Sequence, residues 1–213
     1  MPSVSREPKS SPAVSQDASR YFGNEMKFQP ELRVRVITGT ARGRKLKTPA
    51  GYDVRPTSDQ VKEAIFNICQ FDIEGRRVLD LFAGSGQMGL EALSRGATKA
   101  TFIDSSRDAM EIVKKNASIT KFTDDSKFIV SDSVNYIRKM AGKDKYDLVF
   151  IDPPYAQKLY VSVLTALLDA DMLKTTSLVI CESGDGDVFG GNSALEARFE
   201  VVKNARYSHS YIT

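Results

Sequence analysis

The stretch VLDLFAGSGQMGLEAL, residues 78–93, decides the fold of this 213-residue chain. Apolar residues run from Val78 to Phe82 as in a buried strand, glycines follow in a short loop, and a helical pattern extends from Gln87 to Ser94. A glycine-rich loop between a strand and a helix presents backbone N–H groups and the positive end of the helix dipole. The stretch therefore predicts one βα unit with a ligand-binding loop.

The chain downstream repeats this alternation. Further helices are expected at residues 107–117, 134–140 and 160–168, and further strands at residues 100–103, 127–130, 146–151, 178–181, 198–202 and 206–212. Strands separated by helices form parallel sheets with right-handed crossovers. We therefore predict an α/β fold with a doubly wound, mostly parallel seven-stranded sheet, closed by an antiparallel hairpin.

Three regions are expected. Residues 1–30 are rich in Ser, Pro and charge and form a disordered or added tail, residues 31–54 form a small basic β-hairpin extension, and residues 55–213 form the α/β domain. No apolar run approaches the about 18 residues of a membrane helix, and the first residues lack a signal-like stretch. A soluble, cytoplasmic monomer is expected.

Cysteine and histidine are scarce. The only cysteines are Cys69 and Cys181, and the only histidine is His209. Neither a disulfide framework nor a metal site is therefore expected.

The formal net charge is only +3, but its distribution is uneven. Between residues 33 and 47 there is no acidic residue and there are six basic ones: Arg33, Arg35, Arg42, Arg44, Lys45 and Lys47. One interpretation is a solvated, charged hairpin. The other is a surface for nucleic-acid phosphates, since Lys and Arg release counterions and the intervening glycines permit close approach. Charge alone leaves both open.

A second motif, Asp152-Pro153-Pro154-Tyr155, follows the apolar run 148–151. The lone pair of a base's exocyclic amine is delocalised, so the amine attacks a methyl donor only if two acceptors hold its N–H groups. The Asp152 carboxylate and the Pro153 carbonyl can be those acceptors, because proline fixes the backbone and removes a donor. Tyr155 can stack on a flipped base. Alone, the prolines could simply end a strand; with the glycine loop, they indicate methyl transfer.

Charge also separates two cofactors. The loop matches the G-x-G-x-x-G pattern of nicotinamide-binding folds, whereas a P-loop is excluded by the absence of Gly-Lys-Ser/Thr. Four acids fall at or just beyond the ends of four successive strands: Asp80, Asp104, Asp132 and Asp152. A charge ~4 Å from a pyrophosphate is repelled by about 4 kcal/mol at an effective dielectric of about 20. S-adenosylmethionine carries an ammonium and a sulfonium, and therefore suits these acids better.

The expected cofactor site extends across three loops. Asp104 would accept from the ribose hydroxyls and Asp132 from the adenine amine, and the loop amides would hold the carboxylate. The other members of this expected site are Asp80, Phe82, Ala83, Gly84, Ser85, Gly86, Ser105 and Ser133. Each acid has an alternative role, because Asp104 and Asp132 precede helices and could be caps, a Ser105 capping box could include Asp108, and Asp80 could fix its own loop.

With these motifs the chain resembles the bacterial 16S ribosomal RNA guanine-N2 methyltransferases of the RsmD type, which have the class I S-adenosylmethionine-dependent fold. The resemblance extends from about Arg33 to the C-terminus and rests on residues 35–46, 55–66, 80–86, 90–96 and 152–155. It implies methylation of a flipped guanine held by Asp152 and Tyr155, with the small ribosomal subunit or its RNA as partner. It also implies that the hairpin grips RNA and that Arg55 and Thr57 close over the methionine end of the cofactor.

The expected mechanism is direct in-line transfer without a covalent enzyme intermediate, with Asp152 or water taking the proton. Four alternatives remain open: an adenine-N6 methyltransferase acting on RNA or DNA, a protein-glutamine methyltransferase, an NAD-binding oxidoreductase and a non-catalytic RNA-binding module.

Overall fold

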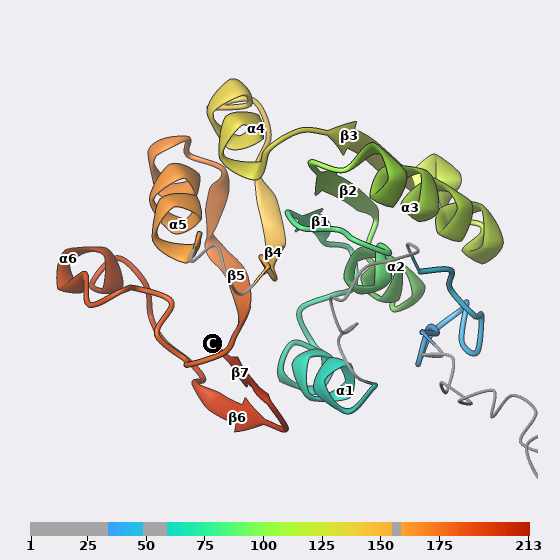
Figure 1. Cartoon of the computed structure of the whole chain (residues 1–213), viewed down its shortest axis with the longest axis horizontal. Coiled ribbons are helices and arrows are strands. Elements are labelled where there is room, and N and C mark those ends of the chain that lie inside the picture. The colour runs from blue at the N-terminus through green and yellow to red at the C-terminus, as the bar shows by residue number, and fades with distance from the viewer. Residues whose placement is uncertain (1–33, 49–58, 155–158) are drawn as a thin grey trace, which may run out of the picture. The chain divides into compact units, whose positions relative to one another are not determined.

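A seven-stranded sheet organises the chain in a computed structural model that describes residues 34–48, 59–154 and 159–213 (Figure 1). The strands are β1 (Arg77–Asp80), β2 (Lys99–Asp104), β3 (Ser126–Val130), β4 (Tyr146–Ile151), β5 (Leu173–Ser183), β6 (Ala205–Tyr207) and β7 (Ser210–Ile212). They lie in the order β3-β2-β1-β4-β5-β7-β6. The first five pair in parallel and the last two add an antiparallel hairpin, which confirms the predicted fold class.

Helices cover both faces of the sheet. The helices are α1 (Asp59–Ile68), α2 (Gln87–Ser94), α3 (Arg107–Thr120), α4 (Ser133–Lys139), α5 (Tyr160–Asp169) and α6 (Ser193–Glu196). In Figure 1, α1, α2 and α3 lie on one side of the central strands, and α4 and α5 lie on the other. No helix within the described ranges is long and apolar enough to cross a bilayer.

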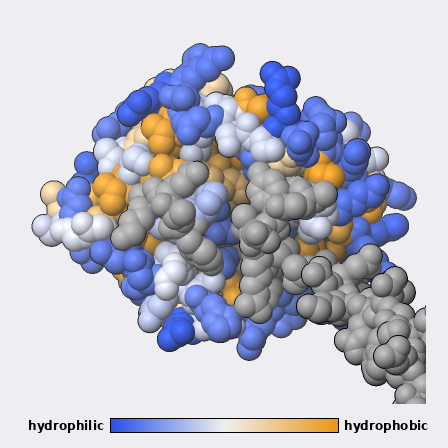
Figure 2. Space-filling model, viewed as in Figure 1, coloured by the Kyte–Doolittle hydropathy of each residue, from blue (hydrophilic) through white to orange (hydrophobic). Residues whose placement is uncertain are grey.

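Strand residues alternate between two hydrophobic cores. Phe102 and Phe150 pack in the core under α1, α2 and α3, whereas Ile103 and Val149 pack in the core under α4 and α5. Apolar residues on both faces are typical of a buried parallel strand. Hydrophilic residues cover most of the periphery of the face drawn in Figure 2, and hydrophobic residues gather toward its centre.

The C-terminal strands differ from the prediction. Residues 198–202 contain no strand, and both strands of the hairpin come from residues 205–212, which turn at Ser208 with φ 57°. Phe199 packs beside Phe189, while Val201 and Val202 are exposed, so the alternating pattern there belongs to a loop. Strand β5 begins before the predicted 178–181, because Leu173 pairs with Tyr146 of β4; the exposed polar residues 174–176 that follow lie where the register between the two strands shifts.

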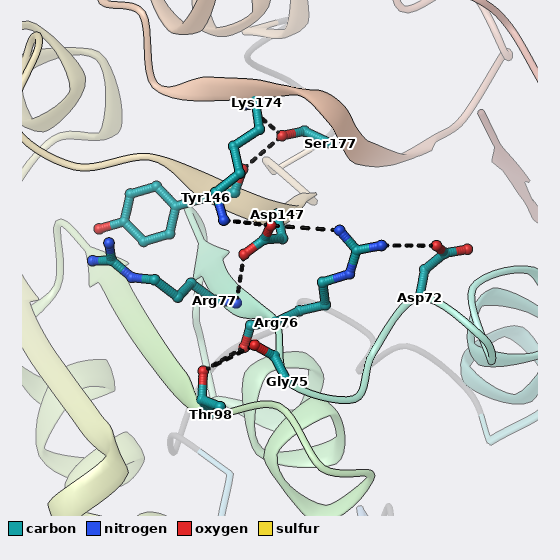
Figure 3. Close-up of polar contacts among 9 residues, drawn as sticks. All are labelled: Asp72, Gly75, Arg76, Arg77, Thr98, Tyr146, Asp147, Lys174 and Ser177. Atoms are coloured by element: carbon teal, nitrogen blue, oxygen red, sulfur yellow. Dashed lines mark hydrogen bonds and ion pairs between the residues drawn. The ribbon is translucent and has the colours of Figure 1, made fainter.

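The amino ends of the central strands are joined by a charge network (Figure 3). The Asp147 carboxylate, only 6% exposed, accepts from Lys174 Nζ at 2.6 Å, from the Arg77 backbone N–H at 2.9 Å and from Arg76 Nη1 at 3.5 Å. Burial by itself would raise the pKa of Asp147, but these donors and the nearby positive charges bring it below its usual value. This network links β1, β4 and β5.

Candidate functional site

The sheet changes direction between β1 and β4. From β1 the chain continues to β2 and β3 on one side, and it returns as β4 on the other. In doubly wound sheets ligands bind at such a switch point, beyond the carboxyl ends of the strands. Leu81 N donates to Phe150 O at 3.2 Å, and Ala83 N donates to Ile103 O at 2.9 Å. The loop after β1 therefore leaves the sheet between the ends of β2 and β4.

The glycine loop is held in a conformation that its residue types require. Gly84 and Gly86 have φ of 54° and 77°, which side chains of other residues disfavour. A Cβ on Gly86 would lie 2.9 Å from Val113 Cγ1, so the loop also lacks room for one. Gly86 N donates to Ala83 O at 2.6 Å and precedes α2. The amino end of α2 therefore faces the carboxyl edge of the sheet.

Asp80 lies beneath this loop and is 3% exposed. Its Oδ2 accepts from Gly89 N of α2 at 3.2 Å, so Asp80 ties the end of β1 to the helix that follows the loop. Burial raises the pKa of Asp80 to about 7, although the backbone hydrogen bonds oppose this shift. Glycine at position 89 also lets α2 pack closely on β2, since a Cβ there would lie 2.3 Å from the ring of Phe102. A neighbouring cation would favour the ionised form of Asp80.

Asp104 and Asp132 bind backbone amides at the next two strand ends. Asp104 Oδ2 accepts from Gly84 N, and Oδ1 accepts from Ser106 N, both at 2.8 Å. Asp132 caps α4 by accepting from Asn135 N at 2.9 Å. Each carboxylate oxygen has a second lone pair that remains for a ligand. Structural and ligand-binding roles are thus compatible at both positions.

One predicted cap is wrong. The N-cap of α3 is Ser106, whose Oγ accepts from Ala109 N at 3.2 Å, and not Ser105. Asp104 Oδ1 binds Ser106 N, and the N-cap lies one residue later than the Ser105 of the expected capping box. Ser105 itself is exposed.

Two buried polar atoms at this edge have no hydrogen-bond partner within the described part of the chain. They are Ser133 Oγ, in a residue only 4% exposed at the start of α4, and Gln87 Oε1, in a residue 8% exposed at the start of α2. A buried polar group without a partner is costly and indicates a missing ligand or water. Gln87 was not predicted from the sequence, although its position after the second glycine of the loop was a usable signal.

The second motif continues directly from β4. Asp152 is half-buried, Pro153 is buried and Pro154 is exposed. Since Ile151 pairs with Cys181 and Phe150 with Asp80, Asp152 lies just beyond the carboxyl end of β1. Phe82 is half-buried and Ala83 is buried at the same edge. Tyr155, Arg55, Thr57 and Arg33 lie outside the described residues.

The basic hairpin has one buried and one exposed side. Val36 N donates to Arg44 O at 3.0 Å, Leu46 N donates to Val34 O at 2.8 Å, and the valines and the leucine are buried in the core that contains α2. All described basic residues of the hairpin are exposed: Arg35, Arg42, Arg44, Lys45 and Lys47. Arg35 pairs with Asp59 at 3.0 Å. The other four have no acidic partner among the described side chains.

Residues that hold the hairpin were missed as functional residues. Glu91 is fully buried, accepts from Ile37 N at 2.7 Å and Thr38 N at 2.9 Å, and pairs with Arg95 at 2.9 Å. Ser94 Oγ accepts from Ala41 N at 2.9 Å. In the described ranges no cluster of three His, Cys, Asp or Glu is arranged to hold a metal.

The chain is similar in sequence and in fold to several known proteins. Residues 34–212 match the family model described as conserved hypothetical protein 95. The Bacillus subtilis protein YlbH is 37% identical over 150 residues, which are 70% of this chain and 82% of that protein. A Haemophilus influenzae relative is 35% identical over 70% of this chain and 78% of its own. The solved structure of Escherichia coli yhhF has a TM-score of 0.71 at 31% identity, covering 84% of this chain and 95% of that one.

Proposed function

The chain belongs to the conserved hypothetical protein 95 family, the methyltransferases of the RsmD type, and from this membership we propose that it methylates the N2 amine of a flipped guanine in small-subunit ribosomal RNA. The Haemophilus influenzae and Escherichia coli relatives are named ribosomal RNA small subunit methyltransferase D. The observation that carries the proposal is that the glycine loop and Asp152-Pro153 emerge at one switch point, joined by the hydrogen bond from Leu81 N to Phe150 O. Such a substrate places the enzyme in the cytoplasm.

The carboxyl edge fits S-adenosylmethionine, which when bound supplies an electrophilic methyl group on a sulfonium. The first amides of α2 would bind its carboxylate, and Asp80 below them, in its ionised form, would favour its ammonium. Asp104 would accept from the ribose hydroxyls, while Asp132 and Ser133 Oγ, which has no hydrogen-bond partner among the described residues, would hydrogen-bond the adenine. A pyrophosphate over Asp80 would instead be repelled or force a proton onto that carboxyl group, which argues against a nicotinamide cofactor.

Asp152 and Pro153 act on the target base. The Asp152 carboxylate accepts one N–H of the guanine amine and the Pro153 carbonyl accepts the other, so the nitrogen lone pair turns toward the methyl donor. Proline at 153 and 154 removes two backbone donors that would compete for these acceptors. Tyr155 stacks on the base plane. After transfer the surplus proton leaves to Asp152 or to water.

The hairpin of residues 34–48 contacts the RNA backbone. Arg42, Arg44, Lys45 and Lys47 point out of a hairpin whose other side is fixed in the core, so their positive charges form a firmly positioned phosphate-binding surface. Arg35 contributes less, because Asp59 already pairs with it. This assigns residues 31–54 to RNA contact and residues 55–213 to catalysis.

The test is transfer of labelled methyl from S-adenosylmethionine to small-subunit particles from cells that lack this enzyme, followed by nucleoside analysis of the RNA. N2-methylguanosine is the expected product, and Asp152→Ala should abolish its formation. N6-methyladenosine would move the activity to adenine. Cofactor binding without any labelled RNA would reject an RNA substrate.

A further inference from the structure

Asn116 of α3 joins two parts of the proposed enzyme that bind different ligands. Its side chain is fully buried. Oδ1 accepts from Lys47 N at 2.8 Å, and Nδ2 donates both to Lys47 O at 2.9 Å and to Ser85 O at 2.8 Å. Both N–H groups and the oxygen of the amide are therefore engaged. One side chain holds the end of the basic hairpin and the middle of the glycine loop.

The contact to the glycine loop falls at its most adaptable point. Ser85 lies between Gly84 and Gly86, which both adopt positive φ and can rotate more readily than other residues. The Ser85 carbonyl shares a peptide plane with Gly86 N–H, which donates to Ala83 O. By fixing the Ser85 carbonyl, Asn116 fixes the direction of the peptide groups that face the cofactor.

The contact to the hairpin falls at a proposed phosphate-binding residue. The side chain of Lys47 is exposed, whereas its backbone N–H and C=O both bind Asn116. Any shift of this backbone on RNA binding therefore acts directly on the Asn116 side chain. Because the amide has no spare donor, such a displacement is transmitted to Ser85 or leaves a buried carbonyl unpaired.

The other hairpin anchors lack the second contact. Glu91 binds the hairpin backbone at Ile37 and Thr38, and Ser94 binds it at Thr38 and Ala41. Lys62 binds it at Arg35. Within the described residues, none of these three side chains makes a hydrogen bond to residues 80–86. They dock the hairpin on α1 and α2. Asn116 alone among these four connects the hairpin to the cofactor loop.

We propose that Asn116 is a positioning residue that couples RNA binding at the hairpin to the cofactor loop, so that RNA and cofactor each tighten the binding of the other. The inference rests on the proposed function, since it assigns the hairpin to RNA and the loop to S-adenosylmethionine. Coupling of this kind is reciprocal and commonly amounts to about 5–150-fold in affinity.

The test compares Asn116→Asp with Ser94→Ala. The aspartate keeps an acceptor for Lys47 N and nearly the same shape, but it loses the donors to Lys47 O and Ser85 O. Ser94→Ala removes two hairpin hydrogen bonds and leaves the glycine loop untouched. For each protein, calorimetry gives the Kd of S-adenosylhomocysteine with and without a small-subunit RNA fragment, and circular dichroism gives the Tm.

In the wild-type protein the RNA should tighten S-adenosylhomocysteine by about tenfold. In Asn116→Asp this factor should fall below about twofold, while Ser94→Ala should bind RNA more weakly and keep the factor. If Asn116→Asp does not fold, Asn116→Ala serves in its place. If both variants have a lower Tm but only the Asn116 variant loses the coupling, the loss of coupling is due to the positioning role of Asn116 and not to lower stability.

Three results would overturn the inference: no coupling in the wild-type protein, full coupling in the Asn116 variants, or equal loss of coupling in Ser94→Ala. The labelled-methyl assay run on the same wild-type preparation tests the proposed function separately. RNA methylation without coupling would reject only the role of Asn116. Absence of RNA methylation would reject the proposed function itself.

Discussion

The two edges of the parallel sheet use acidic residues in opposite ways. At the amino edge, Asp147 binds Lys174 and Arg76, and Asp144 binds Arg77 at 2.8 Å. At the carboxyl edge, Asp80, Asp104 and Asp132 accept from backbone N–H groups, and within the described ranges none of the three pairs with a basic side chain. Both sets lie at or next to the ends of strands of the same sheet, so position along the strand and not residue type separates them.

The difference is visible in the most buried acid of each edge, Asp147 at the amino edge and Asp80 at the carboxyl edge. Asp147 is compensated by cations, and its pKa is lowered despite burial. Burial raises the pKa of Asp80 to about 7, because amides alone compensate its charge. A buried carboxylate that pairs with a basic side chain of the protein stabilises the fold. A buried carboxylate without such a partner is suited to binding a cationic ligand. A positively charged cofactor is therefore expected to bind most favourably at the carboxyl edge.

The largest expected effect comes from Asp152→Ala. Removing one of two acceptors for the target amine should lower kcat by about 10²–10³-fold, as loss of one preorganised polar contact does elsewhere. Single-turnover methyl transfer measures this, and the Kd of S-adenosylhomocysteine should stay within about twofold. A variant that retained near wild-type kcat would remove Asp152 from the chemistry.

Asp147→Ala, at the other end of the same strand, should do the reverse. It leaves the part-buried Arg77 N–H unpaired and should lower the free energy of unfolding by about 1–3 kcal/mol, with kcat per folded molecule unchanged. Urea denaturation gives the loss. Because the pKa of Asp147 is below the ordinary 3.8, its contribution is present above about pH 4 and is lost as pH falls below its folded-state pKa. Equal stability of the two proteins at pH 7 would contradict the assignment.

Cofactor affinity should depend on pH through Asp80. The pKa of this carboxyl group is raised to about 7, and the ammonium of the cofactor favours its ionised form, so binding requires loss of a proton at lower pH. The Kd of S-adenosylhomocysteine should rise by about tenfold per pH unit below pH 7 and level off above it. Calorimetry from pH 5.5 to 8.5 tests this, and Asp80→Asn should give a flat profile. A flat wild-type profile would show that Asp80 does not respond to the ligand.

The smallest effect is expected from single charges of the hairpin. Arg44→Ala should reduce the slope of log Kd for RNA against log salt by about 1, because one phosphate contact is lost. Lys145→Ala is the matched control, since Lys145 lies at the amino edge of β4 and pairs with Asp171 at 2.7 Å. An equal change of slope in both variants would show that the hairpin is no special RNA surface.

Local patterns predicted the elements around the site well. The bounds of α2 and β4 agree with the predicted ranges, because a glycine loop precedes α2 and the apolar run 148–151 ends β4. The C-terminal hairpin was misplaced, since its turn at Ser208 carries neither glycine nor proline. The four acids were identified from their places after strands. Their roles toward ligands stay predictions, while Asp104 and Asp132 do bind backbone amides at helix starts.

Contacts over long sequence separation could not be predicted in this way. Glu91 and Ser94 lie more than fifty residues from the hairpin amides they bind, and Asn116 lies 69 residues from Lys47. The block at residues 90–96 carried part of the family resemblance, but only the packing of α2 against the hairpin explains its buried polar residues. Docking of the hairpin depends on tertiary structure, which periodicity does not encode.

A crystal structure of the protein with S-adenosylhomocysteine is the most direct test of the contrast between the two edges. The ligand should lie at the carboxyl edge, with its carboxylate on the first amides of α2, its ribose at Asp104, its adenine near Asp132 and Ser133, and its sulfur facing Asp152. A ligand bound elsewhere, or at this edge with its amino group away from Asp80, would contradict the account.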